Sequence, residues 1–174
     1  MLPSVIVVMG VSGCGKTIIA SQLATRLGWQ FAEADLFHSP ANVAKMRSAV
    51  ALTDDDRRPW LGDIATWIDA ARASGTPSII ACSALKRRYR EMIVGNREDV
   101  RLVYLKGGYD LIAQRMAARS HHYMPLALLQ SQFDALEEPG PDENAIVIGI
   151  DAPPEEIVAA IIAALGPQVA VQRI

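Results

Sequence analysis

Residues 10–17 constrain the fold of this chain more than any other segment. They read Gly-Val-Ser-Gly-Cys-Gly-Lys-Thr and fit the pattern G-x-x-x-x-G-K-[ST] at every fixed position. Glycines let the backbone turn so tightly that successive N–H groups point at phosphate oxygens, and the following helix offers its positive N-terminus to the same anion. An apolar run at residues 4–9 predicts a buried strand before the loop, and residues 16–27 have helical spacing after it. This context favours a phosphate-binding loop over the alternative, a glycine-rich turn with an incidental lysine.

The loop also predicts a nucleotide and a metal ion. Lys16 supplies a mobile positive charge for the β- and γ-phosphates, and the Thr17 hydroxyl ligates Mg²⁺. ATP and Mg²⁺ are therefore the expected cofactors. The residues predicted to bind ATP are Gly10, Val11, Ser12, Gly13, Cys14, Gly15, Lys16 and Thr17.

Strands alternate with helices along the chain, which predicts an α/β fold with a mostly parallel sheet between two helical layers. The expected strands cover residues 4–9, 30–34, 78–82, 101–105 and 145–150. The expected helices cover residues 16–27, 41–50, 59–73, 86–94, 109–119, 126–136 and 154–165. We expect a single domain over residues 1–166, with a substrate-binding insertion near 36–76, a lid near 115–126 and a loose tail at 167–174.

Composition excludes several classes of protein. Hydrophobic residues make up 51% of the chain and charged residues 21%, so the chain is globular rather than disordered. A net charge of -2 argues against a nucleic-acid partner bound through a broad basic surface. The three arginines of the basic run, Arg87, Arg88 and Arg90, are read as the solvated face of a helix. Without a leader peptide or an apolar run of membrane-spanning length, we expect a cytoplasmic enzyme with no membrane partner.

The chain lacks the motifs of two large classes of phosphate-loop proteins. D-x-x-G and N-K-x-D, typical of GTPases, are absent, and the third strand ends without the magnesium-binding Asp of a motor ATPase. The acids must come from the second strand as Glu33 and Asp35, which point to the same side of an extended segment. We expect Glu33 to serve the metal and Asp35 to orient the acceptor hydroxyl. The alternative is that both acids only cap the next helix.

Four blocks of the sequence resemble the gluconate kinase family. Residues 35–46 match D-x-x-H-x-x-x-N-x-x-K-M, residues 54–61 match D-x-D-R-x-P-W-L, residues 82–90 match C-S-A-L-K-x-x-Y-R, and residues 104–107 match Y-L-K-G. Further residues resemble the lid of the family and the helix after it: Arg115, Arg119, His122, Ser131, Gln132, Phe133, Leu136, Glu137 and Pro139. The resemblance covers nearly the whole chain.

The resemblance implies transfer of the ATP γ-phosphoryl group to the 6-hydroxyl of D-gluconate. It also implies a fold like that of nucleoside monophosphate and shikimate kinases, and a homodimer, because family members are often dimers. The chain departs from the family at residues 48–52, which lack the usual glycine and proline, and at residues 120–123 of the lid. Two alternatives stay open: another kinase of the same fold that acts on shikimate or a nucleotide, and a nucleotide-binding regulator without turnover.

Gluconate presents a carboxylate and a row of hydroxyls, and a carboxylate calls for Arg or Lys. The candidates matched to the family are Lys45, Arg57 and Lys86, and the sequence leaves open which of them binds the carboxylate. His38 is expected to hydrogen-bond a substrate hydroxyl, with a helix cap as the alternative. Asp35 completes the predicted substrate-binding set.

Two arginines of the expected lid join Lys16 and Asp35 as predicted catalytic residues. Arg115 and Arg119 lie four residues apart and share one helix face, from which a closing lid brings both guanidiniums onto the transferring phosphate. The alternative is a pair of solvated surface arginines. The adjacent histidines at 121 and 122 lack a third ligand at metal spacing, so we expect no zinc site.

Overall fold

A five-stranded parallel sheet forms the centre of the molecule. The structure, a computed structural model, describes residues 2–118 and 126–171. The strands follow the order β2-β3-β1-β4-β5, and every neighbouring pair is parallel. Their bounds are β1 (Val5–Met9), β2 (Gln30–Glu33), β3 (Ser78–Ala81), β4 (Val100–Lys106) and β5 (Ile146–Gly149). The predicted α/β class with a parallel sheet is therefore confirmed.

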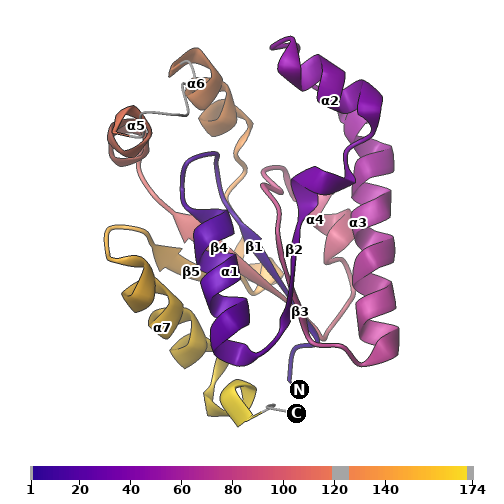
Figure 1. Cartoon of the computed structure of the whole chain (residues 1–174), viewed down its shortest axis with the longest axis vertical. Helices are drawn as coiled ribbons and strands as arrows, with labels where there is room; N and C mark the ends of the chain where they lie inside the picture. Colours follow the sequence, from indigo (N-terminus) through magenta and orange to yellow (C-terminus); the bar gives the residue numbers. More distant parts are fainter. Residues whose placement is uncertain (1, 119–125, 172–174) are drawn as a thin grey trace.

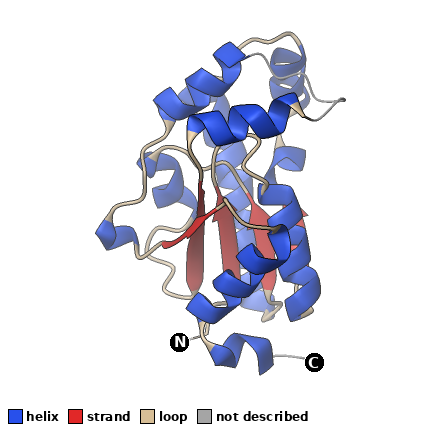
Figure 2. Ribbon diagram, turned by 90° about the vertical axis from the view of Figure 1, so that its left-hand side faces the viewer, coloured by secondary structure: helices blue, strands red, loops and turns tan. Residues whose placement is uncertain are grey.

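Helices cover both faces of the sheet (Figure 1, Figure 2). Their bounds are α1 (Lys16–Leu27), α2 (Pro40–Arg47), α3 (Asp54–Ser74), α4 (Arg87–Ile93), α5 (Tyr109–Ala117), α6 (Leu126–Ala135) and α7 (Pro154–Leu165). α1 and α7 pack on one face, and α3 and α4 pack on the other, as the three-layer prediction requires. α2, α5 and α6 lie beyond the carboxyl ends of the strands (Figure 1). Within the described ranges, no helix is long and apolar enough to cross a membrane.

β1 is buried along its whole length because it is the central strand of the sheet. Its side chains alternate between two cores. Ile6 and Val8 pack with α1 and α7, whereas Val5, Val7 and Met9 pack with α3 and α4. The loop that follows Met9 is therefore held by a strand that is anchored on both faces.

α3 begins earlier than the sequence predicts. The predicted helix began at residue 59, whereas α3 runs Asp54–Ser74. Thr53 is the N-cap: its hydroxyl accepts from Asp56 N at 3.1 Å, and the Asp56 carboxylate accepts from Thr53 N at 2.9 Å. This capping box and the acids beside the positive helix end stabilise the first turn. They offset Pro59, which lies inside the helix and leaves one backbone hydrogen bond unmade.

Two other segments differ from their expected conformation. β2 ends at Glu33, and Ala34–Phe37 forms a 3₁₀ helix. The expected loose tail contains a further 3₁₀ helix, Pro167–Val171, while residues 172–174 lie outside the described part of the chain. Val169 is 1% exposed and packs in the core with α1 and α7. Because burying one such side chain stabilises a fold by about 1.5–3 kcal/mol, this segment is held to the domain.

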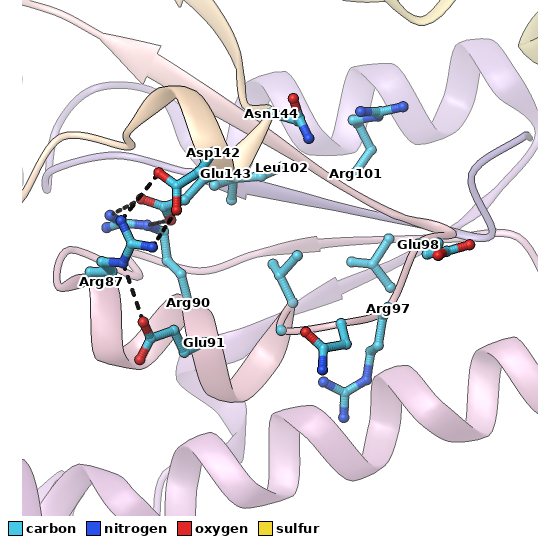
Figure 3. A pocket seen from close by; sticks show the side chains of 14 residues that line it. Arg87, Arg90, Glu91, Arg97, Glu98, Arg101, Leu102, Asp142, Glu143 and Asn144 are labelled. Atoms are coloured by element: carbon cyan, nitrogen blue, oxygen red, sulfur yellow. Dashed lines mark hydrogen bonds and ion pairs between the residues drawn. The ribbon is translucent and has the colours of Figure 1, made fainter.

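Arg90 contradicts the prediction that the basic run is a solvated face, although Arg87 and Arg88 in that run are exposed. In Figure 3 the Arg90 side chain lies beside Glu143. The Arg90 side chain is 2% exposed and donates to the Glu143 carboxylate at 2.5 and 2.9 Å. Its remaining nitrogen donates to the carbonyl oxygens of Ala84 and Leu85, both at 3.1 Å. This ion pair, beside a cavity of about 560 Å³, fixes the loop between β3 and α4.

Candidate active site

The phosphate loop joins β1 to α1 at the carboxyl edge of the sheet (Figure 1). Gly13 and Gly15 have φ angles of 81° and 96°, a backbone conformation that residues with a side chain rarely adopt. A Cβ atom at Gly13 would also lie 2.8 Å from the Met116 side chain of α5. Gly15 is the N-cap of α1, so the helix N-terminus opens directly onto the loop. Both glycines are therefore required by the loop conformation.

Two polar side chains of the loop have partners in this structure. Lys16 Nζ donates to the Val11 carbonyl oxygen at 3.0 Å, which holds the ammonium group across the loop. Thr17 Oγ1 donates to Glu33 Oε2 at 2.6 Å, so the two residues predicted to serve magnesium lie side by side. Burial raises the pKa of Glu33, and the hydrogen bond from Thr17 opposes that shift. A hydroxyl and a carboxylate are the oxygen ligands that Mg²⁺ prefers, so these residues fit the ion.

Asp35 is placed by a 3₁₀ helix rather than by a strand. The extended geometry expected for both acids stops at Glu33, and Asp35 lies within Ala34–Phe37. The charge of Asp35 contributes to the raised pKa of Glu33, so the two carboxylates remain neighbours. The alternative was that Glu33 and Asp35 only cap the next helix. They do not cap α2, because its N-cap is Ser39, whose hydroxyl accepts from Asn42 N. Asp35 is exposed, and within the described part of the chain no hydrogen bond to its carboxylate is found.

The predicted substrate cations lie around the first turn of α3, and each already has a partner. Lys45 donates to Asp56 at 2.8 and 2.9 Å, and Lys86 donates to Asp54 at 3.2 Å. Arg57 Nη1 donates to a main-chain carbonyl oxygen at 2.6 Å. The hydrogen bond from Lys45 lowers the pKa of Asp56 to about 2, so the Asp56 carboxylate is ionised at neutral pH.

The ring of Tyr89 in α4 contacts two of these cations. Arg57 and Lys86 lie 5.8 and 5.7 Å from the centre of its ring, within cation–π range. Its hydroxyl donates to Asp54, which also pairs with Lys86 and Arg88. Tyr89 and Asp54 were not among the residues assigned to the site from sequence. The available signal was their position inside two of the motif blocks that carry the family resemblance.

His38 follows Glu33 and Asp35 in the chain and contacts the start of α3. Its ring stacks on Trp60 with the ring centres 4.2 Å apart, and Trp60 Nε1 donates to the Ala34 carbonyl oxygen at 2.8 Å. Asn42 Nδ2 lies 3.4 Å from His38 Nδ1 and donates to the Asp56 carbonyl oxygen at 2.9 Å. Burial lowers the pKa of His38, so the ring is neutral at neutral pH. A neutral imidazole suits a hydroxyl better than a carboxylate.

Arg115 lies on the α7 side of the phosphate loop. Its Nη2 donates to the Ile150 carbonyl oxygen at 2.6 Å. The side chain lines a cavity of about 500 Å³ that extends from the loop to the start of α7. Arg119, His121 and His122 lie outside the described residues, as does most of the expected lid, so the predicted pairing of the two arginines remains a prediction.

Gln132 of α6 also reaches the phosphate loop. Its Oε1 accepts hydrogen bonds from Ser12 N at 3.3 Å and from Ser12 Oγ at 3.2 Å. The sequence contained one signal for this contact, because residues 131–133 match the family resemblance, but that match carried no role for Gln132.

The fold and the loop together define the class of protein. Shikimate kinase from Acinetobacter baumannii shares the fold with a TM-score of 0.56 at 18% identity, over 95% of this chain and 93% of that one. Residues 5–139 match the family described as AAA domain. A parallel sheet with this loop after its central strand, and with acids beside the loop, is a small P-loop kinase.

Comparison with curated proteins narrows the class. The gluconokinase of Gluconobacter oxydans is 43% identical over 160 residues, which cover 92% of this chain and 90% of that protein. The chain belongs to the gluconokinase family. The thermoresistant gluconokinase of Escherichia coli is 41% identical over 157 residues, 90% of each chain. The crystal structure of a gluconokinase from Sinorhizobium meliloti has a TM-score of 0.86 at 38% identity, over 97% of this chain and 94% of that one.

Proposed function

We propose that this chain transfers the γ-phosphoryl group of ATP to the 6-hydroxyl of D-gluconate, forming 6-phospho-D-gluconate and ADP. The observation that carries the proposal is that a phosphate loop, two acids and three cations gather at one edge of the sheet in a gluconokinase-family chain. Phosphoryl transfer depends on positioning and on neutralising charge. The gathered residues supply both.

ATP binds with its phosphates on the loop N–H groups and the N-terminus of α1. Lys16 then exchanges the Val11 carbonyl oxygen for the β- and γ-phosphates. Thr17 would ligate Mg²⁺ directly, and Glu33 would hold one of its waters. When bound, the ion withdraws negative charge from the phosphate oxygens.

Asp35 orients the acceptor. Its exposed carboxylate accepts a hydrogen bond from the 6-hydroxyl, whose oxygen attacks the γ-phosphorus while the bond to ADP breaks. The hydroxyl proton passes to Asp35. Arg115 and Arg119 complete the proposed catalytic set by stabilising charge on the transferring group, for which Arg115 gives up its bond to the Ile150 carbonyl oxygen.

The substrate carboxylate binds among Lys45, Arg57 and Lys86. Lys45 is paired with Asp56 and Lys86 with Asp54, and both acids belong to the first turn of α3. The carboxylate of the substrate therefore replaces one of these aspartates as the partner of a lysine. The neutral ring of His38 binds a hydroxyl of the substrate. The pocket therefore exchanges one anion for another rather than leaving a cation unpaired, and only an acidic sugar can make this exchange.

D-Gluconate is expected to have a kcat/KM at least about a hundredfold above that of D-glucose. Glucose carries similar hydroxyls but no carboxylate. It therefore cannot form the ion pair with Lys45 or Lys86 that would replace the one each lysine makes with Asp56 or Asp54. Initial rates of ADP release with both sugars measure the ratio. Equal efficiency for the two sugars would mean that no carboxylate site exists.

The function as a whole is tested by ADP release across gluconate, other sugar acids, shikimate and nucleoside monophosphates. The product is identified by phosphorus NMR as the 6-phosphate. Turnover of shikimate or a nucleotide without turnover of gluconate would overturn the proposal, and so would nucleotide binding without turnover of any acceptor.

Glu33→Gln is expected to raise the Mg²⁺ concentration for half-maximal activity by about tenfold or more. The amide still accepts from Thr17 but loses the charge that holds a metal-bound water. The measurement is activity against Mg²⁺ at saturating ATP and gluconate. Glu98→Gln removes an exposed carboxylate away from the loop and serves as the control. A Mg²⁺ dependence unchanged from wild type would contradict the role of Glu33.

A homodimer, which the family resemblance implies, and a cytoplasmic location both stay proposals. Light scattering coupled to size exclusion measures the first, and fractionation of the native host measures the second. Neither property enters the chemistry above, which uses residues of one chain.

A further inference from the structure

Gln132 connects two parts of the molecule that are far apart in sequence. It lies on α6, and its Oε1 accepts both the N–H and the O–H of Ser12 in the phosphate loop, at 3.3 and 3.2 Å. In Figure 1 the loop between β1 and α1 rises towards α5 and α6. The contact therefore places a neutral carboxamide at the mouth of the phosphate site.

The orientation of this carboxamide follows from its partner. A backbone N–H only donates, so the atom that faces Ser12 N is the oxygen of Gln132. The amide nitrogen, which is bonded to the same carbon, then also lies beside the loop. Among the described residues it has no hydrogen-bond acceptor, and it is not one of the fully buried polar atoms. Within the ranges that the structure describes, Gln132 thus has two N–H donors without an acceptor beside the site.

The position of α6 is supported by packing on both sides of Gln132. Leu129, one helical turn before it, is 1% exposed and lies in the same core as Val11 and Cys14 of the loop. Two residues beyond the end of α6, Glu137 N donates to the Leu85 carbonyl oxygen at 2.8 Å. The glutamine is therefore presented by an anchored helix.

We propose that the Gln132 amide nitrogen donates a hydrogen bond to the γ-phosphoryl group of bound ATP, while its oxygen stays on Ser12. The proposal rests on the proposed function only in that the loop binds ATP, and it needs no particular acceptor. A neutral donor fits this place because Lys16 and Mg²⁺ already supply charge, whereas the γ-phosphoryl group needs orientation. Gln132 also distinguishes ATP from ADP, since only ATP has the group that it contacts.

Two substitutions separate the donor from the acceptor of this side chain. Gln132→Ala removes both. Gln132→Glu keeps an oxygen for Ser12 N and Oγ but replaces the donor with a second acceptor that repels phosphate. Affinities for ADP and for a non-hydrolysable ATP analogue are measured by calorimetry with Mg²⁺ for wild type and both variants. Gln130→Glu, an exposed position on the same helix, controls for the added charge.

Both variants are expected to lose about tenfold in affinity for the ATP analogue while the affinity for ADP stays within about twofold, because a hydrogen bond to a charged group is lost. A loss in Gln132→Ala alone would mean that the side chain only docks α6 on Ser12. A loss in Gln132→Glu alone would reflect charge. Either result, or a loss below about threefold in both variants, overturns the proposal. Because no acceptor is present, failure of gluconate as a substrate leaves this test unaffected.

Discussion

Replacing Lys16 with alanine is expected to lower kcat by about a thousandfold or more and to leave the protein folded. The ammonium group lies across the phosphate loop, 3.0 Å from the Val11 carbonyl oxygen. In the proposed mechanism its charge stabilises the β- and γ-phosphates during transfer. Lys16 is only partly buried and makes one side-chain hydrogen bond, to the Val11 carbonyl oxygen, so its truncation removes no apolar side chain from either core.

The measurement is kcat from coupled ADP release, with the melting temperature recorded in parallel. Arg26→Ala, which removes an exposed cation from the last turn of α1, is the matched control and should retain activity. A purified Lys16→Ala protein with near-normal kcat would remove Lys16 from the mechanism.

Asp35→Asn is expected to lower kcat by about a hundredfold or more with little change in ATP affinity. The amide has the same shape but cannot take the proton of the acceptor hydroxyl. Asp35 is exposed and accepts no side-chain hydrogen bond within the described residues, so the substitution does not break a structural contact. Steady-state kinetics and calorimetry with ATP measure the two quantities.

Asp63→Asn, an exposed acid on α3, provides the control for loss of one carboxylate. If Asp35→Asn weakened ATP binding while kcat held, Asp35 would serve the nucleotide and the acceptor would be oriented by another group.

Local signals predicted the phosphate loop and its helix well. The run Lys16–Leu27 was expected from helical spacing and a terminal glycine, and the structure has the same bounds. The bounds of such a helix are set by residues close to one another in the sequence, so the spacing of apolar residues and the capping residues predict them directly. Thr17 and Glu33 were each expected to serve the metal, and the structure places them within hydrogen-bond distance at the carboxyl edge of the sheet, while their role in binding Mg²⁺ stays a prediction.

Other features depend on contacts that no local pattern reports. Arg90 looks like one more exposed arginine until Glu143, 53 residues later, is brought against it. The contact between Ser12 and Gln132 spans 120 residues. The start of α3 was predicted too late because proline is usually found in the first turn of a helix, and Pro59 was therefore taken as its start. In the structure the Thr53 capping box stabilises an earlier start, so Pro59 lies inside the helix. In each case a distant or competing interaction decided the outcome.

On the proposed roles, the substrate carboxylate and the ATP phosphates are bound by separate parts of this chain. Asp54 and Asp56 come from a single helical turn, and they hold lysines from two other segments. Neither acid contributes to the loop that binds phosphate. Replacing Asp54 is expected to free Lys86 and to favour more anionic acceptors, whereas replacing Asp56 would also remove the capping box of α3. If these roles hold, a change confined to one helical turn is enough to alter which acceptor this chain prefers.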